Sequence, residues 1–167
     1  TATTTADYNT GLGSQTLAAN TTGASNTALG RQALYANTTG GNNTAVGTYS
    51  LDANTTGEEN TALGDGSLGT NTTGDRNVAL GARALLAATS SDNTAVGYDA
   101  LGDSTTGGDN VAIGGRTLAV ATTADNNVAV GYQAGTAVTT GGSNTCIGAA
   151  TGDSTVTTGG GNVIVGY

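Results

Sequence analysis

The stretch Asn43-Thr44-Ala45-Val46-Gly47 recurs along the chain with small substitutions. Its copies follow one another every 17 residues, apart from one interval of 16 and one of 18, and they open at Asn9, Asn26, Asn43, Asn60, Asn77, Asn93, Asn110, Asn127, Asn144 and Asn162. So strict a period indicates a repeat protein whose units stack on their neighbours. We number the repeat positions from 1 to 17, starting at this Asn. No composition shift marks a domain boundary, so residues 1–167 are predicted to be one repeat array.

The composition favours thin layers over a single wide core. The 167 residues include 29 Gly but no Pro, Phe, Trp, Met or His, so the large apolar side chains are Leu, Val, Ile and six Tyr. A solenoid needs only enough small side chains to fill each layer. Disorder is the alternative for a chain rich in Gly, Thr, Asn and Ser. The strict period argues against it.

Charge and hydropathy exclude several classes of partner. The formal net charge is −8 and the only cations are four Arg, whereas nucleic-acid binding needs clustered Lys and Arg. No apolar run approaches the roughly 20 residues that span a bilayer, so no membrane insertion is expected. One Cys cannot form an internal disulfide.

Each repeat predicts three elements. Positions 1 to 5 are predicted to form a short strand, because their β-branched and apolar residues end at a Gly that permits a turn. Positions 7 to 10 carry a small residue and Leu, and are predicted to be a second short strand or extended segment. Asn-Thr-Thr-Gly at positions 12 to 15 and the two polar residues after it are predicted to form the return loop. The predicted fold is all-β, a parallel β-roll or β-solenoid of about ten 17-residue coils.

Two sets of residues are predicted to form structural ladders along the rod. Stacked Asn amides can hydrogen-bond to one another, and Gly permits the turn after the strand. These residues are Asn26, Asn43, Asn60, Asn77, Asn93, Asn110 and Asn127 at position 1, and Gly30, Gly47, Gly64, Gly81, Gly97, Gly114 and Gly131 at position 5.

Both faces of the predicted strand are apolar. In the repeat at Asn110, Val111 and Ile113 point to one face and Ala112 to the other. One face can fill the coil, but the other would be an exposed apolar stripe, which soluble monomers avoid. Copies of the same chain are the simplest cover, and closed cyclic symmetry is the usual arrangement. The sequence does not fix the number of chains.

The repeat resembles two known families. Asn110-Val111-Ala112-Ile113-Gly114, with the small Thr117 three residues later, resembles the head repeat of YadA-like trimeric autotransporter adhesins. The longer unit Asn-Thr-Ala-x-Gly-x-x-Ala-Leu-x-x-Asn-Thr-Thr-Gly resembles head-like repeats of phage tail fibres. The resemblance implies a left-handed parallel β-roll, a homotrimer, and an extracellular location in a cell-surface or virion fibre. The repeats here are longer than those of the adhesin heads, which enlarges the return loop.

No residue pattern indicates catalysis, so no enzyme and no cofactor are predicted. Cys146 occupies position 3, where other repeats have Ala, and is predicted to be a buried filler. A group of acidic residues precedes the repeat Asn and could form a ridge with oxygen ligands for Ca²⁺. Because no known calcium repeat is present, a solvated ridge is the preferred interpretation and no metal site is predicted. These acidic residues are Glu58, Glu59, Asp75, Asp92, Asp109 and Asp125.

Three further patterns are candidates for modification or binding. Asn20, Asn37, Asn42, Asn54 and Asn71 fit the N-glycosylation pattern, although the repeat itself produces it. Tyr near the predicted turns could stack on sugars, but packing at the edge or against a neighbouring chain is the preferred interpretation; these are Tyr35, Tyr49, Tyr98 and Tyr132. A column of Thr could face a ligand or ice, with one Thr per layer pointing outward, and comprises Thr22, Thr39, Thr56, Thr73, Thr106, Thr123 and Thr140.

The sequence as a whole predicts a structural or adhesive segment of an extracellular or virion fibre. Its copies would assemble through apolar strand ladders and present polar loops to a surface glycan or receptor. No polar capping repeat is visible at either end, so one alternative is a subunit that polymerises end to end into a filament. The other alternative is an ice-binding solenoid that uses the Thr column.

Overall fold

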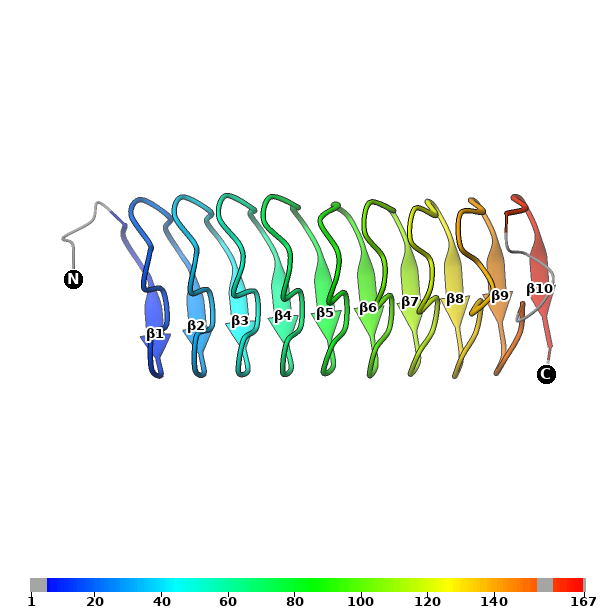
Figure 1. The fold of residues 1–167 in the computed structure, drawn as a ribbon, viewed down its shortest axis with the longest axis horizontal. Coiled ribbons are helices and arrows are strands. Elements are labelled where there is room, and N and C mark those ends of the chain that lie inside the picture. The colour runs from blue at the N-terminus through cyan, green and yellow to red at the C-terminus, as the bar shows by residue number, and fades with distance from the viewer. Residues whose placement is uncertain (1–5, 153–157, 167) are drawn as a thin grey trace.

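The computed structural model describes residues 6–152 and 158–166, which wind into a straight β-solenoid (Figure 1). Ten strands lie side by side in sequence order in one parallel sheet, and about nine turns of the coil connect them. The prediction of an all-β parallel solenoid is confirmed. The strands are β1 (Thr10–Leu12), β2 (Thr27–Leu29), β3 (Thr44–Val46), β4 (Thr61–Leu63), β5 (Val78–Leu80), β6 (Thr94–Val96), β7 (Val111–Ile113), β8 (Val128–Val130), β9 (Thr145–Ile147) and β10 (Val163–Val165).

The strands pair strictly in register, so each repeat position forms a column along the rod. Thr27 pairs with Thr44 and Ala28 with Ala45, and the same positions pair in every neighbouring strand. The 16-residue repeat that opens at Asn77 keeps this register, because Ala79 still pairs with Ala95. The missing residue is therefore absorbed outside the sheet.

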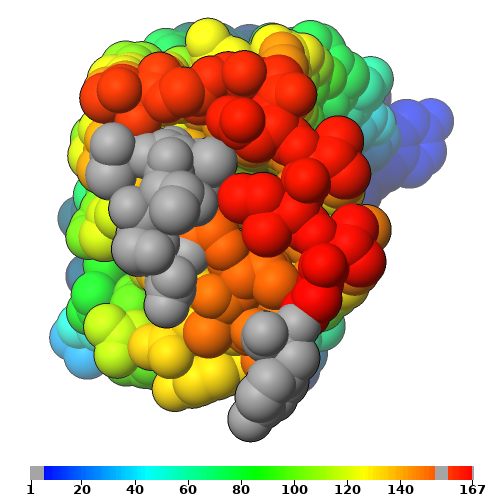
Figure 2. Space-filling model, turned by 90° about the vertical axis from the view of Figure 1, so that its right-hand side faces the viewer, coloured from blue at the N-terminus to red at the C-terminus, as the bar shows by residue number. Residues whose placement is uncertain are grey.

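The interior is filled by small side chains from the strand and by Leu from the far side of the coil. Ala45 at position 3 and Leu51 at position 9 are fully buried, as are their counterparts in most coils. Viewed from the C-terminal end, the red residues that include β10 run along the top and right of the cross-section, and orange residues of the preceding coil lie beside them (Figure 2). Each layer thus buries one Ala face of the strand, as the sequence predicted.

Positions 7 to 10 are not a second strand, and that prediction is wrong. Tyr49 at position 7 and Leu51 at position 9 have φ of 56° and 52°, in the left-handed region, and the other coils repeat this pattern. The N–H of Tyr49 donates to Arg31 O of the preceding coil at 3.0 Å, whereas the N–H of Leu51 donates to Ser67 O of the following coil at 2.9 Å. A left-handed residue costs roughly 1–2 kcal/mol. Burying the one Leu of each coil gains about 1.5–3 kcal/mol, which offsets much of the cost of the two left-handed residues.

The packing changes towards the C-terminal end, where the sequence replaces Leu at position 9 by Gly. In the coil that opens at Asn127, Gly135 stands at this position, and a Cβ there would lie 2.8 Å from Cδ2 of Leu118. Val138 of the same coil is fully buried at position 12, where the first coils have Asn. Leu118 therefore packs into the space beside Gly135, and Val138 takes the buried place of the position-12 Asn.

Candidate interaction surfaces

A ladder of buried Asn at position 1 holds the coils together at the start of each strand. Asn60 is typical: its Nδ2 donates to Gly74 O at 2.8 Å and to Asn43 Oδ1 at 3.1 Å. Its Oδ1 accepts from the backbone N–H of Asn77 at 3.0 Å. Each amide thus bonds to the coils before and after it, so these residues are structural and none offers a free polar group to a ligand.

A second Asn ladder at position 12 contains four of the five candidate glycosylation acceptors. Nδ2 of Asn54 donates to Asn37 Oδ1 at 2.8 Å and to Gly57 O at 3.0 Å. Asn37, Asn54 and Asn71 are fully buried, and Asn20 belongs to the same ladder. A glycan on such an Nδ2 would break the ladder of the folded coil. Asn42, at position 17, is the candidate whose residue is exposed.

The outer face of the sheet presents a continuous apolar stripe, which we call the position-4 stripe. Leu63 is 51% exposed and Ile113 41% exposed, and Thr or Val at position 2 lines the stripe on the same face. The flat in-register sheet places these side chains in one straight row along the rod. The stripe consists of Leu12, Leu29, Val46, Leu63, Leu80, Val96, Ile113, Val130, Ile147 and Val165.

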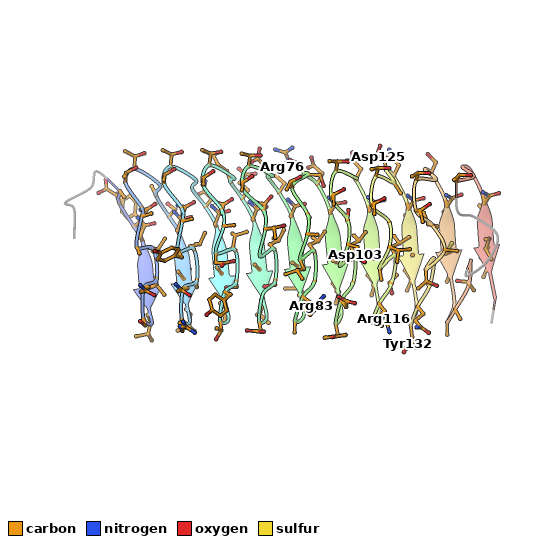
Figure 3. All side chains as sticks on the ribbon, viewed as in Figure 1. Arg76, Arg83, Asp103, Arg116, Asp125 and Tyr132 are labelled. Carbon is orange, nitrogen blue, oxygen red and sulfur yellow. The ribbon has the colours of Figure 1, made fainter. Side chains whose placement is uncertain are left out.

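The acidic residues lie on the edge that precedes the strands, where Figure 3 labels Arg76 and Asp125. Asp92 is bound by Arg76 through two bonds of 2.7 and 2.8 Å, and this guanidinium lowers the pKa of Asp92. Oδ1 of Asp75 and of Asp125 accepts a backbone N–H from the preceding coil, each at 2.8 Å. Within the described residues, no three acidic, His or Cys side chains gather closely enough to hold a metal ion.

The Thr column at position 14 is exposed in each described coil that contains it, from Thr22 to Thr140. The neighbouring Thr at position 13 also reaches solvent, because both lie in a bend instead of a strand, so the prediction of one outward Thr per layer is wrong. The Thr38 hydroxyl donates to Thr55 O of the next coil at 2.9 Å, and this bond recurs along the rod. The 16-residue repeat interrupts the column, since Ser90 follows Thr89 there.

Cys146 is buried at position 3 of β9, as the sequence predicted. Burial raises the pKa of its thiol, which reduces the thiolate fraction needed for nucleophilic attack. The side chain takes the place of the Ala that other coils bury at this position.

The edge that follows the strands carries Arg and Tyr, and Figure 3 labels Arg83, Arg116 and Tyr132 there. Position 6 holds Tyr98 and Tyr132, and position 7 holds Arg83 and Arg116. Sequence reasoning singled out the Tyr but not the Arg beside them. An alignment of the repeats could have identified these Arg, because positions 6 and 7 of successive repeats become neighbours once the coils stack.

Comparison with protein-family models, curated proteins and solved structures finds no match to this chain. The described part of the chain also contains no helix of a length and hydropathy suited to crossing a membrane. The surfaces of the rod are therefore the features that bear on its function.

Proposed function

We propose that this chain is a structural and adhesive segment of an extracellular or virion fibre. Its copies pack through the outer faces of their sheets into a left-handed homotrimer, and their turns and loops remain available to a glycan or receptor. The observation that supports this proposal is the position-4 stripe, which runs the length of the sheet with side chains as exposed as Leu63 and Ile113. Stripes of this kind mark surfaces that are covered by a partner.

The size of the stripe suits self-association. Full burial of an aliphatic side chain gains about 1.5–3 kcal/mol, and roughly half of this remains to be gained where the side chain is half-exposed. Ten such side chains give on the order of 10 kcal/mol for each chain, against about 4–15 kcal/mol for the lost freedom of association. Assembly is therefore favoured when many layers pack together, because the gain grows with rod length while the cost does not.

The oligomeric mass tests the proposal directly. Light scattering after size-exclusion chromatography is expected to give three times the chain mass of 15.9 kDa. Replacing both Leu63 and Ile113 by Arg should leave the circular dichroism spectrum unchanged and shift the mass to that of one chain. The matched control is Val120→Arg, because Val120 is an exposed apolar residue at position 11, outside the sheet.

Other masses would count against the proposal in different ways. A wild-type mass of one chain at micromolar concentration would contradict assembly through the sheet. A broad distribution of masses that the double substitution does not alter would instead support end-to-end polymerisation.

Ice binding is a second candidate, favoured by the exposure of the whole position-14 Thr column. It ranks second because the 16-residue repeat interrupts the column and the position-13 hydroxyls already donate to the backbone. If ice binding is correct, millimolar protein should shape ice crystals and lower the freezing point below the melting point. Replacing Thr56 and Thr73 by Lys should then abolish the gap between the two temperatures. A gap of zero in the wild type would exclude this function.

A further inference from the structure

Two exposed Tyr stand on the same edge of the rod with a Gly between them. Tyr98 and Tyr132 both occupy position 6, two coils apart, and are 57% and 59% exposed. Gly115 occupies position 6 of the coil between them. We call Tyr98, Gly115, Tyr132 and the adjoining Arg116 the tyrosine platform, and Figure 3 shows Arg116 and Tyr132 together on this edge.

The platform is held in register by the solenoid backbone. The N–H of Arg116 donates to Tyr98 O at 2.8 Å, and the N–H of Gln133 donates to Gly115 O at 3.0 Å. The Tyr132 ring lies against Gly115, since a Cβ at residue 115 would be 3.5 Å from ring atom Cδ2. Two coils separate the Tyr residues by about 9.6 Å along the rod, at roughly 4.8 Å for each strand spacing.

Arg116 is the guanidinium that the rest of the rod leaves available. Arg76 binds Asp92 at 2.7 Å, Arg83 binds Asp99 at 3.2 Å, and Arg31 lies 5.0 Å from the ring centre of Tyr49. Arg116 is exposed and forms no ion pair with any residue in 6–152 or 158–166. An unpaired, exposed cation on the coil between two exposed Tyr points to a ligand that has both a negative charge and flat apolar faces.

We propose that the tyrosine platform binds a linear acidic polysaccharide. The C–H faces of alternate pyranose rings stack on Tyr98 and Tyr132, which offer large, rigid, amphipathic surfaces. A uronate carboxylate between them accepts two parallel hydrogen bonds from the Arg116 guanidinium, whose planar fork matches that group. Gly115 leaves room for the Tyr132 ring to lie against the backbone of its coil, and the sugar chain follows the rod axis past both rings.

A sugar chain fits this surface better than an acidic peptide. The platform is on an exposed turn, with both Tyr rings open to solvent and the nearest strands already paired on both sides. An extended peptide would gain most by adding to a free strand edge or by filling pockets with its side chains. A sugar chain that stacks on the exposed Tyr rings and pairs with one guanidinium needs neither a free strand edge nor side-chain pockets.

Binding to the platform does not depend on assembly through the sheet. The platform lies on the turn after the strand, whereas the position-4 stripe lies on the strand itself. A result that contradicts assembly through the sheet therefore does not contradict sugar binding at the tyrosine platform, and the reverse also holds. A monomeric wild type that binds the sugar would overturn the trimer alone, and a trimer that does not bind would overturn the platform alone.

Titration calorimetry with an alginate hexasaccharide, which is a chain of uronates, tests the inference. The wild type is expected to bind it at least about tenfold more tightly than a neutral cellohexaose, a difference of about 1.4 kcal/mol. Tyr98→Ala, Tyr132→Ala and Arg116→Gln are each expected to weaken alginate binding about tenfold. Affinity should also fall as salt is raised, because the ion pair is exposed.

Tyr49→Ala is the matched control, because the guanidinium of Arg31 already lies over the Tyr49 ring. It should leave alginate affinity unchanged, and all variants should keep the wild-type mass and melting temperature. No detectable binding of alginate by the wild type would overturn the inference, as would equal losses in the control and the platform variants. Binding of poly-glutamate as tightly as alginate, with the same dependence on Tyr98 and Tyr132, would overturn it in favour of an acidic peptide.

Discussion

Replacing Gly64 by Ala is expected to destabilise the rod by at least about 3 kcal/mol. Gly64 has φ of +141°, in a region that is essentially restricted to Gly, and the strain of such a position is about 1–3 kcal/mol. The added Cβ would also lie 2.5 Å from both the carbonyl carbon and the oxygen of Gly81 in the next coil. These are backbone atoms in the turn after β5, where the N–H of Gly81 donates to Leu63 O at 2.8 Å, so the two coils must separate to admit the methyl group.

Gly66→Ala is the matched control, two residues away in the same turn. Gly66 has φ of +61°, and the nearest atom to its Cβ would be Cδ1 of Leu86 at 3.7 Å. Other coils place Tyr49 and Arg83 at this position with φ of 56° and 60°. The control should therefore lose about 1–2 kcal/mol, the usual cost of a left-handed residue. Urea and thermal unfolding of both variants measure the difference, and equal losses would show that close approach of the coils is not what fixes Gly64.

The requirement for Gly at position 5 could be predicted only in part from the sequence. Its presence in all ten copies, from Gly13 to Gly166, indicated a turn at the end of each strand. The reason that the structure gives is different in kind, because the carbonyl of the next Gly fills the space of a side chain. Contacts between consecutive coils depend on the stacking distance, which no single repeat contains.

The left-handed residues at positions 7 and 9 could not be predicted. Apolar Leu beside a small residue is also what a buried strand contains, and non-Gly residues with positive φ are uncommon. Leu51 adopts this conformation because the narrow coil must reverse its direction while its N–H pairs with the following layer. Tertiary packing, and not local propensity, determines the backbone conformation at these positions.

The two candidate surfaces also differ in how far the sequence of a single repeat predicts them. The apolar outer face followed from alternation within three residues, so Ile113 was identified from its own repeat. The tyrosine platform joins Tyr98, Arg116 and Tyr132 from three different repeats. Such a site appears only when residues about 17 positions apart are read as neighbours, which requires the register of the coils.

Replacing Asn110 by Ala is expected to cost about 3–5 kcal/mol, the second large effect. Its Nδ2 donates to Ala124 O at 2.7 Å, and its Oδ1 accepts from the N–H of Asn127 at 2.9 Å. Position 12 of this coil is Ala121, which has no amide to replace the lost donor. The substitution therefore removes the Asn partner of two backbone groups inside the rod, and an unpaired buried group costs about 1–3 kcal/mol.

The same substitution should cost less in the first half of the chain, where the two Asn ladders share their acceptors. In Asn60→Ala, Gly74 O keeps a bond from Nδ2 of Asn71 at 3.0 Å, so a loss of about 2–3 kcal/mol is expected.

Asn54→Ala, at position 12, should cost only about 1 kcal/mol, because Gly57 O keeps a bond of 2.8 Å from Asn43. Ala88 and Ala121 already occupy this position in later coils, so the interior accepts Ala there. Unfolding free energies for Asn110, Asn60 and Asn54 variants should fall in that order of severity. On this view, a ladder stabilises the solenoid to the extent that its Asn side chains bond to backbone groups that have no other partner, and the number of side-chain bonds matters less. A loss of unfolding free energy at Asn54 as large as that at Asn110 would contradict it.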